Sequence, residues 1–193
     1  MSTAFPGIRI TATSAHRTTS HPIETSTRAI TPSIIPAGPL ELYSTVWLNI
    51  STPDILHAIQ IAAPPEAVYP LVSTARGLTQ WWAADVAETA GAVELGFFNR
   101  QTVYRLRSQI NQPQAHFEWS CETGKEWAGT RLVFKLEPIG KGTLVRFTHA
   151  GWERETDYFV SCTTTWGELM FRLKAAAEGK PRGPLFLPGS LAY

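Results

Sequence analysis

The sequence has little of what metal, redox and membrane proteins require. Among its 193 residues only Cys121 and Cys162 are cysteines, and they lie far apart. Zinc sites and CxxC redox motifs need closely spaced cysteines, so we expect two reduced, buried thiols, no metal centre and no cofactor. No apolar run approaches the ~18 residues that span a bilayer, and the N-terminus lacks the apolar segment of a secretory signal. The sequence therefore predicts a cytoplasmic protein without a membrane span.

Net charge is equally scarce. The chain has 17 Lys and Arg against 16 Asp and Glu, which gives a formal net charge of +1. Nucleic-acid-binding domains concentrate basic side chains to neutralise phosphates, so a nucleic-acid partner is not expected. What the chain does have is 44% hydrophobic and 11% aromatic residues. That composition is sufficient to bury a sizeable core in one domain.

The composition divides the chain into three parts. Residues 1–50 are dense in Ser and Thr, carry scattered Arg and show no sustained periodicity, which is typical of disorder. Three interpretations of this leader stay open: a transit segment, a functional tail, and a start assigned too far upstream. Residues 51–182 are predicted to form the folded domain, and 183–193 a C-terminal tail.

Short alternating runs separated by turn residues follow residue 53, as in half-buried antiparallel strands. Strands are predicted at 55–62, 102–110, 115–122, 130–137 and 144–149, the last two forming a hairpin through the glycines at 140 and 142. Two short helices are expected after the first strand, from the Pro64-Pro65-Glu66 start through Val72 and at about 75–82. Pro70 should kink the first helix or end it early, because it has no amide proton to donate.

The strongest pattern lies near the C-terminus. Apolar residues recur there at spacings of four, four, three and four, as on one face of a helix: Tyr158, Cys162, Trp166, Leu169 and Leu173. Thr156 and Asp157 suit the start of this helix, and Gly179 followed by Pro181 ends it. Gly167, inside the helix, indicates either close approach to the sheet or room for a ligand. The element order predicts an α+β fold whose long helix covers the inner face of a curved antiparallel sheet.

Three segments resemble a known superfamily: APPEAVYPLVSTARGLTQWW (63–82), WAGTRLVFKLEPIGKGTLVRFTHAGW (127–152) and CTTTWGELMFRLKAAAEGKPRGP (162–184). Together they look like the START-related helix-grip (SRPBCC) proteins, and within them the bacterial relatives of the activator of heat-shock-protein ATPase, often grouped with polyketide cyclases. Pro70 and the leader depart from the family pattern. The resemblance implies an internal pocket between helix and sheet, which different members use for lipid transfer, hormone binding, polyketide cyclisation or chaperone contact.

Strand and helix parity directs an unusual number of aromatic side chains inward, where large flat rings can line a cavity as readily as fill a core. The predicted cavity residues are Trp81, Tyr104, Phe117, Trp119, Phe134, Phe147, Tyr158, Cys162 and Trp166. Inward aromatics with few polar groups are typical of a site for a small hydrophobic or aromatic molecule, which we predict as the function. Ordinary core packing is the alternative interpretation for each of these residues.

Catalysis has one weak candidate. His149 shares strand parity with Val145 and Phe147 and lies at the end of its strand, where a near-neutral pKa would let it act as an acid or base. A cyclase or hydratase using His149 in the same cavity is therefore one alternative function, and a histidine bonded to nearby backbone is the structural alternative. The other alternative function is a co-chaperone-like module with a chaperone partner. The outward charges, among them Arg105, Arg131 and Lys135, form an ordinary mixed surface that gives this function little support.

Overall fold

The computed structural model describes residues 52–188, so the predictions for residues 1–50 and for 189–193 lie outside the described residues. The elements, in chain order, are β1 (Ile55–Ile61), α1 (Pro65–Ser73), α2 (Ala75–Leu78), β2 (Val86–Thr89), β3 (Ala92–Phe97), β4 (Thr102–Gln112), β5 (His116–Cys121), β6 (Arg131–Ile139), β7 (Gly142–Ala150) and α3 (Asp157–Ala177).

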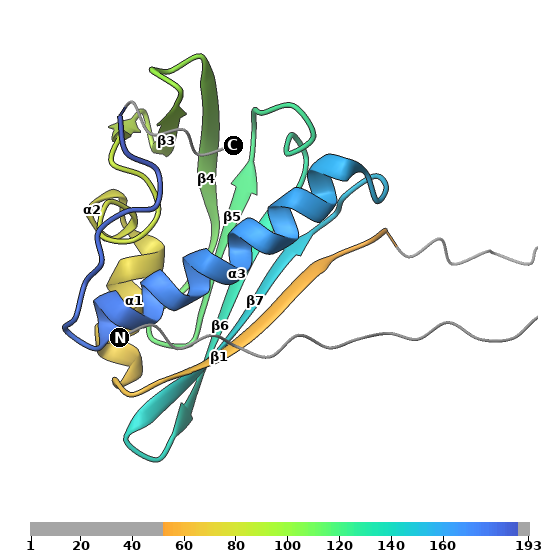
Figure 1. Ribbon diagram of the computed structural model, residues 1–193. Helices are drawn as coiled ribbons and strands as arrows, with labels where there is room; N and C mark the ends of the chain where they lie inside the picture. The colour runs from red at the N-terminus through yellow and green to blue at the C-terminus, as the bar shows by residue number, and fades with distance from the viewer. Residues whose placement is uncertain (1–51, 189–193) are drawn as a thin grey trace, which may run out of the picture. The chain divides into compact units, whose positions relative to one another are not determined.

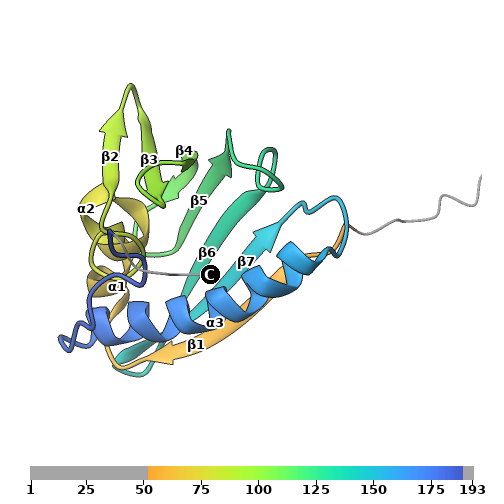
Figure 2. The ribbon, with the colours of Figure 1, turned by 45° about the horizontal axis from the view of Figure 1, so that its top comes forward.

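The strands form one antiparallel, seven-stranded sheet in the order β1-β7-β6-β5-β4-β3-β2, so the first strand lies beside the last. The sheet curves around α3, which runs diagonally across its concave face (Figures 1 and 2). Inward positions such as Leu132, Phe134 and Leu136 of β6 are buried, while Arg131 and Lys135 are exposed. The α+β helix-grip architecture predicted from the pattern is confirmed.

Helix α3 has the predicted stripe and the predicted ends. Thr156 caps it by accepting a hydrogen bond from the Phe159 amide, and Asp157 in the first turn suits the positive end of the helix dipole. Gly179 follows the last turn with a φ of 73°, a left-handed conformation that favours glycine. The buried face includes Cys162, Trp166, Leu169 and Leu173.

The two short helices fill the open end of the sheet beside α3 (Figure 1). Pro70 lies inside α1, and the helix ends three residues later at Ser73. Thr74 then caps α2 by accepting a hydrogen bond from the Gly77 amide. A Cβ added at Gly77 would lie 2.1 Å from the Pro70 carbonyl oxygen, so α1 and α2 meet through a glycine. Helix α2 is shorter than the predicted 75–82, because the chain turns at Leu78 to bury the two following tryptophans.

Strands β2 and β3 were not predicted. Their connection is the two-residue turn Ala90-Gly91, with φ values of 46° and 76°, the geometry of a tight hairpin. In β3 the buried side chains of Val93, Leu95 and Phe97 alternate with the outward Glu94. In β5 the Glu118 side chain is buried, and its carboxylate is paired with Arg131 at 3.2 Å.

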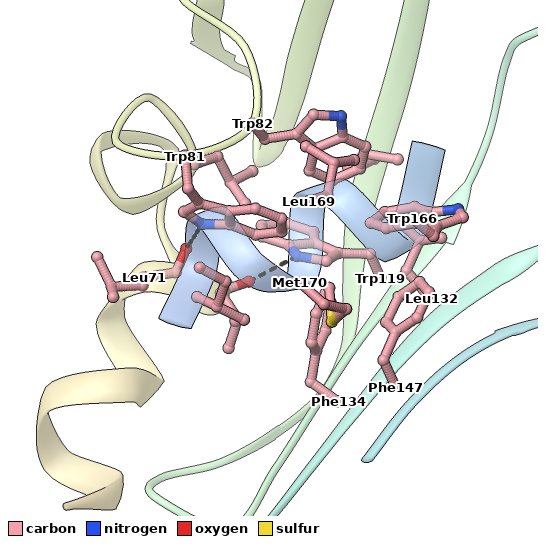
Figure 3. Packing of buried hydrophobic residues seen from close by; sticks show 14 of the residues in the cluster. Leu71, Trp81, Trp82, Trp119, Leu132, Phe134, Phe147, Trp166, Leu169 and Met170 are labelled. Carbon is pink, nitrogen blue, oxygen red and sulfur yellow. Dashed lines mark hydrogen bonds between the residues drawn. The ribbon is translucent and has the colours of Figure 1, made fainter. Parts of the chain in front are cut away.

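The core between α3 and the sheet is built largely from aromatic rings (Figure 3). The indole N–H of Trp81 donates to the Leu71 carbonyl and that of Trp119 to the Val72 carbonyl, each at 2.9 Å. These bonds satisfy two buried donors, and they attach helix α1 to the segment after α2 and to strand β5. Across residues 52–188, every helix is too short or too polar to cross a bilayer.

Candidate functional site

A pocket of about 260 Å³ opens between the first half of α3 and the β3–β4 edge of the sheet. Helix α3 supplies one wall and the β3–β4 hairpin the opposite wall. Three segments outside the helices and strands close the ends. The lining residues are Tyr158, Ser161, Cys162, Thr165, Trp166 and Leu169 from α3, Phe97, Phe98, Thr102 and Tyr104 from the hairpin, and Trp82, Lys125, Trp127 and Phe186 from the connections.

The α3 wall is hollow because three of its side chains are small. Ser161, Cys162 and Thr165 face the pocket where a larger residue would fill it. One turn later, Leu169 reaches the core and is almost fully buried. Side-chain volume along one helix face therefore decides where the interior is open and where it is packed.

The remaining surface is dominated by tryptophan and tyrosine rings. The Trp127 ring stacks on Tyr104, with centroids 4.4 Å apart and planes at 13°, and on Trp166, at 5.8 Å and 19°. Trp82 meets Trp166 edge to face at 4.9 Å. Rings held in this way form a preformed aromatic lining.

The loop that carries Trp127 lies close to Tyr104 because of a glycine. Gly124 has a φ of 121°, and a Cβ there would come within 2.2 Å of Tyr104 Cδ1. The loop could not keep this path with any larger residue. Gly124 thus sets the stack of Trp127 on Tyr104.

Polar groups gather at one end of the pocket. The hydroxyl groups of Tyr104 and Tyr158 form a short hydrogen bond with each other. Burial raises the pKa of both phenols, and for Tyr158 the bond to Tyr104 raises it further. Burial also raises the pKa of the Cys162 thiol beside them, although the nearby Trp127 and Tyr158 donors oppose this effect. At neutral pH this end of the pocket presents protonated hydroxyls and a thiol.

The C-terminal segment closes the pocket from outside. Leu185 and Phe186 donate backbone hydrogen bonds to the Trp81 and Trp82 carbonyls, at 3.2 and 3.0 Å, and the Phe186 carbonyl accepts one from Ala84 at 2.9 Å. The Phe186 ring packs edge to face on Phe97, with centroids 4.8 Å apart. The described part of the predicted tail, residues 183–188, therefore supplies a pocket wall.

The β3–β4 turn at the pocket mouth has an unusual backbone. Phe98, Asn99 and Arg100 all have positive φ, between 52° and 62°, a conformation that costs about 1 kcal/mol or more for residues other than glycine. Arg100 is held by ion pairs with Asp85 at 2.6 Å and Glu94 at 2.8 Å. These contacts stabilise a turn that places the half-exposed Phe98 ring on the pocket rim.

His149 is fully buried behind the pocket wall. An indole N–H can only donate, so the 3.1 Å bond from Trp166 Nε1 makes His149 Nδ1 an acceptor and puts the imidazole proton on Nε2. Nε2 then donates to Thr130 Oγ1 at 2.8 Å, and Thr130 donates to the Trp127 carbonyl at 2.6 Å. Burial lowers the pKa of His149 to about 3. The ring is neutral, has both nitrogens bonded, and does not line the pocket.

The structure separates the predicted cavity residues into two groups. Tyr104, Tyr158, Cys162 and Trp166 line the pocket. The other five lie in the packed core instead: Trp81, Phe117, Trp119, Phe134 and Phe147. Ring contacts such as Phe134 to Phe147, with centroids 5.0 Å apart, occupy the space that a ligand would need there.

Five aromatic wall residues were missing from the predicted cavity: Trp82, Phe97, Phe98, Trp127 and Phe186. Phe97 could have been found from the alternation in Ala92–Phe97. Trp127 and Phe186 lie outside helices and strands, where periodicity gives no signal of direction.

The family model of the "Activator of Hsp90 ATPase homolog 1-like protein" matches residues 62–178, more than half of the chain. The chain belongs to this family. It is a member of the START-related helix-grip superfamily, as its sequence motifs indicated. No curated protein matches the sequence significantly.

Solved structures agree with this membership. The solution structure of the Aha1 dimer from Colwellia psychrerythraea is 30% identical, with a TM-score of 0.59 over 67% of this chain and 98% of that one. CalU16 from Micromonospora echinospora is 16% identical, with a TM-score of 0.54 over 68% and 69% of the two chains. DynU16, from the dynemicin biosynthetic locus, is 17% identical, with a TM-score of 0.55 over 67% and 49%. The last two likenesses concern the fold alone.

Proposed function

We propose that this protein binds a small, flat aromatic molecule in the pocket between α3 and the β3–β4 hairpin. The observation that carries the proposal is a preformed cavity of about 260 Å³ whose walls are mainly aromatic rings. An apolar cavity of about 150 Å³ suffices to bind benzene in another protein. The pocket therefore suits a ligand of about two fused rings in contact with the aromatic side chains that line it.

The pocket can be tested by filling it from α3. Thr165 lines the cavity, whereas its neighbour Thr164 is exposed on the outer face of the same helix. Thr165→Phe should place a ring in the ligand space, and Thr164→Phe provides the matched control. Native mass spectrometry of protein purified from its own host should show a small-molecule adduct on wild type and on Thr164→Phe, and none on Thr165→Phe. An adduct retained by Thr165→Phe would place the ligand elsewhere.

A cyclase or hydratase that uses His149 receives less support. A general acid or base must come within hydrogen-bond reach of its substrate, and both ring nitrogens of His149 are already bonded to Trp166 and Thr130 behind the wall. Proton transfer would fall instead to the Tyr104–Tyr158 pair, whose raised pKa values make them hydrogen-bond donors rather than bases.

A chaperone partner is the second candidate, and family membership is the observation that favours it. The charges of the convex sheet face offer it little, because Arg105 and Arg107 are paired with Glu122, and Arg131 with Glu118. An ATPase assay with the Hsp90 of the same organism tests this function. Faster hydrolysis on addition of the protein would support it, and an unchanged rate would favour ligand binding alone.

We also propose a cytoplasmic location. Both cysteines are free and buried in the structure, and reduced thiols are usual in that compartment. Fractionation of host cells, with the protein detected by antibody, provides the test.

A further inference from the structure

The side of helix α3 that faces away from the sheet carries two exposed apolar side chains. Val160 is 60% exposed and Phe171 is 59% exposed. They are eleven residues, or about three turns, apart, so they lie on the same face of the helix. Thr164 and Gly167 lie between them on that face. These four residues, which we call the outer stripe, carry no charge, whereas the solvent face of a surface helix is usually polar or charged. No described element covers this side of α3 (Figure 2).

Gly167 has no evident role within one copy of the protein. Glycine inside a helix costs about 1 kcal/mol relative to alanine. A Cβ at Gly167 would meet only His57 Cε1, at an ordinary 3.8 Å, and Gly167 does not line the pocket. The packing of the described residues therefore does not require glycine here. A second helix packed on the outer stripe does, because a residue without a side chain lets another backbone approach closely.

The residues of the outer stripe are arranged symmetrically about one point. The midpoint between Thr164 and Gly167 is also the midpoint between Val160 and Phe171. Two copies of α3, packed antiparallel about a twofold axis at this point, therefore set Val160 of each copy against Phe171 of the other, and Thr164 against Gly167. The small residues meet at the centre, where the two backbones are closest. The large residues meet about one and a half turns away on either side.

The charged ends of α3 fit the same arrangement. Asp157 is exposed in the first turn, and Lys174, in the last turn, lies equally far from the midpoint in the other direction. An antiparallel pair brings these opposite charges to the same level at both ends of the contact. Lys174 already donates to Glu178 and to the Gln60 carbonyl. Because its ammonium group has three protons, one remains for Asp157.

We propose that the outer stripe of α3 is the interface of an antiparallel, twofold-symmetric homodimer. This surface lies outside the pocket, so the proposal does not depend on ligand binding. A standard interface buries about 800 Å² per partner, which is more than a helix face about 26 Å long and 10 Å wide supplies. The association is therefore weak and reversible, with an expected Kd of about 10–100 µM.

Sedimentation equilibrium of the full chain, between about 5 and 500 µM, should show this monomer–dimer equilibrium. Val160→Glu and Phe171→Glu each place a carboxylate in the apolar contact and should raise the Kd at least tenfold. Leu56→Glu is the matched control, because Leu56 is 69% exposed but lies on β1, outside the outer stripe; it should leave the Kd unchanged. A wild type that stays monomeric at the highest concentration, or a Phe171→Glu variant that dimerises as well as the wild type, would overturn the proposal.

Cysteine cross-linking tests the direction of the two helices. A disulfide needs Cα atoms within about 7 Å. In the antiparallel pair, position 160 of one copy meets position 171 of the other, whereas the two copies of either position lie about 16 Å apart along the helix axis. Oxidation of a mixture of Val160→Cys and Phe171→Cys should therefore give a covalent dimer, and oxidation of either variant alone should not.

The wild type is the blank for this experiment, because Cys121 and Cys162 are buried. Cross-linking of Val160→Cys alone as fast as the mixture would indicate parallel helices and overturn the antiparallel arrangement. A mixture that gives no covalent dimer would overturn the interface itself.

Discussion

The burial of His149 determines how the stability of the protein should depend on pH. Its pKa is lowered to about 3 in the folded state, against about 6.5 in an unfolded chain. Between these values the unfolded state binds the proton and the folded state does not. The contribution of His149 to stability is therefore present above pH 6.5 and is lost as the pH falls towards 3.

The size of the effect follows from the two pKa values. Lowering the pH from 7.5 to 5.0 should reduce the free energy of unfolding by about 2 kcal/mol through His149 alone. The physical cause is twofold: the charged ring would be buried without water, and a protonated Nδ1 could no longer accept the Trp166 N–H. The pKa values of Glu122 and Glu178 are also lowered, so their contributions to the free energy of unfolding are likewise lost on acidification, but only below about pH 4.5.

Urea denaturation of wild type and His149→Gln at pH 7.5 and 5.0 measures this difference. Glutamine can accept from Trp166 and donate to Thr130 without titrating, so the variant should lose about 2 kcal/mol less than the wild type over this interval. His57, whose pKa is also lowered by burial, is present in both proteins and cancels. Equal losses in the two proteins would refute the neutral, doubly bonded state of His149.

For three further substitutions, the structure sets the direction of the change in ligand affinity or in the free energy of unfolding. Phe186→Ala removes a pocket wall and should weaken the binding of a two-ring aromatic probe such as 1-indanone about tenfold in isothermal titration calorimetry; an unchanged Kd would mean that the C-terminal segment does not touch the ligand. Gly167→Ala should raise the free energy of unfolding by up to about 1 kcal/mol, since its Cβ would lie an ordinary 3.8 Å from His57 Cε1. Gly124→Ala should lower it by about 2 kcal/mol or more, because the new Cβ collides with Tyr104; in urea denaturation, the opposite sign would refute either expectation.

The sequence pattern predicted those parts of the fold in which periodicity acts over many residues. The stripe from Tyr158 to Leu173 and the alternation in β6 and β7 each bury one face of a long element, and the structure has both. Strand β2 was missed because Val86–Thr89 is short and only partly buried, whereas β3 was missed although Ala92–Phe97 alternates. Gly167 shows a different limit: its cost in a helix was evident, but the structure gives neither a close approach nor a place on the pocket wall.

The pocket itself could be predicted only in part, for a physical reason. Strand parity indicates that Phe134 and Tyr104 both face inward. It does not indicate that Phe134 packs against other rings while Tyr104 borders a cavity. That difference depends on the residues opposite each ring, which come from distant parts of the chain. Tyr104 faces the small Ser161–Thr165 stretch of α3, and Phe134 faces Phe147 and Trp81.

Because His149 is buried and neutral, the stability of the protein should depend on pH while its affinity for a ligand should not. With a folded-state pKa of about 3, His149 stays neutral at pH 5, so it continues to hold Trp166 in place in every folded molecule. Burial raises the pKa values of Tyr104, Tyr158 and Cys162 above their ordinary values, so these donors do not titrate in this range either. The Kd for a two-ring aromatic probe such as 1-indanone should therefore be constant between pH 5 and 7.5, even though the free energy of unfolding falls. A tenfold change in Kd centred near pH 6.5 would contradict this, since it would require an exposed, titrating histidine at the ligand.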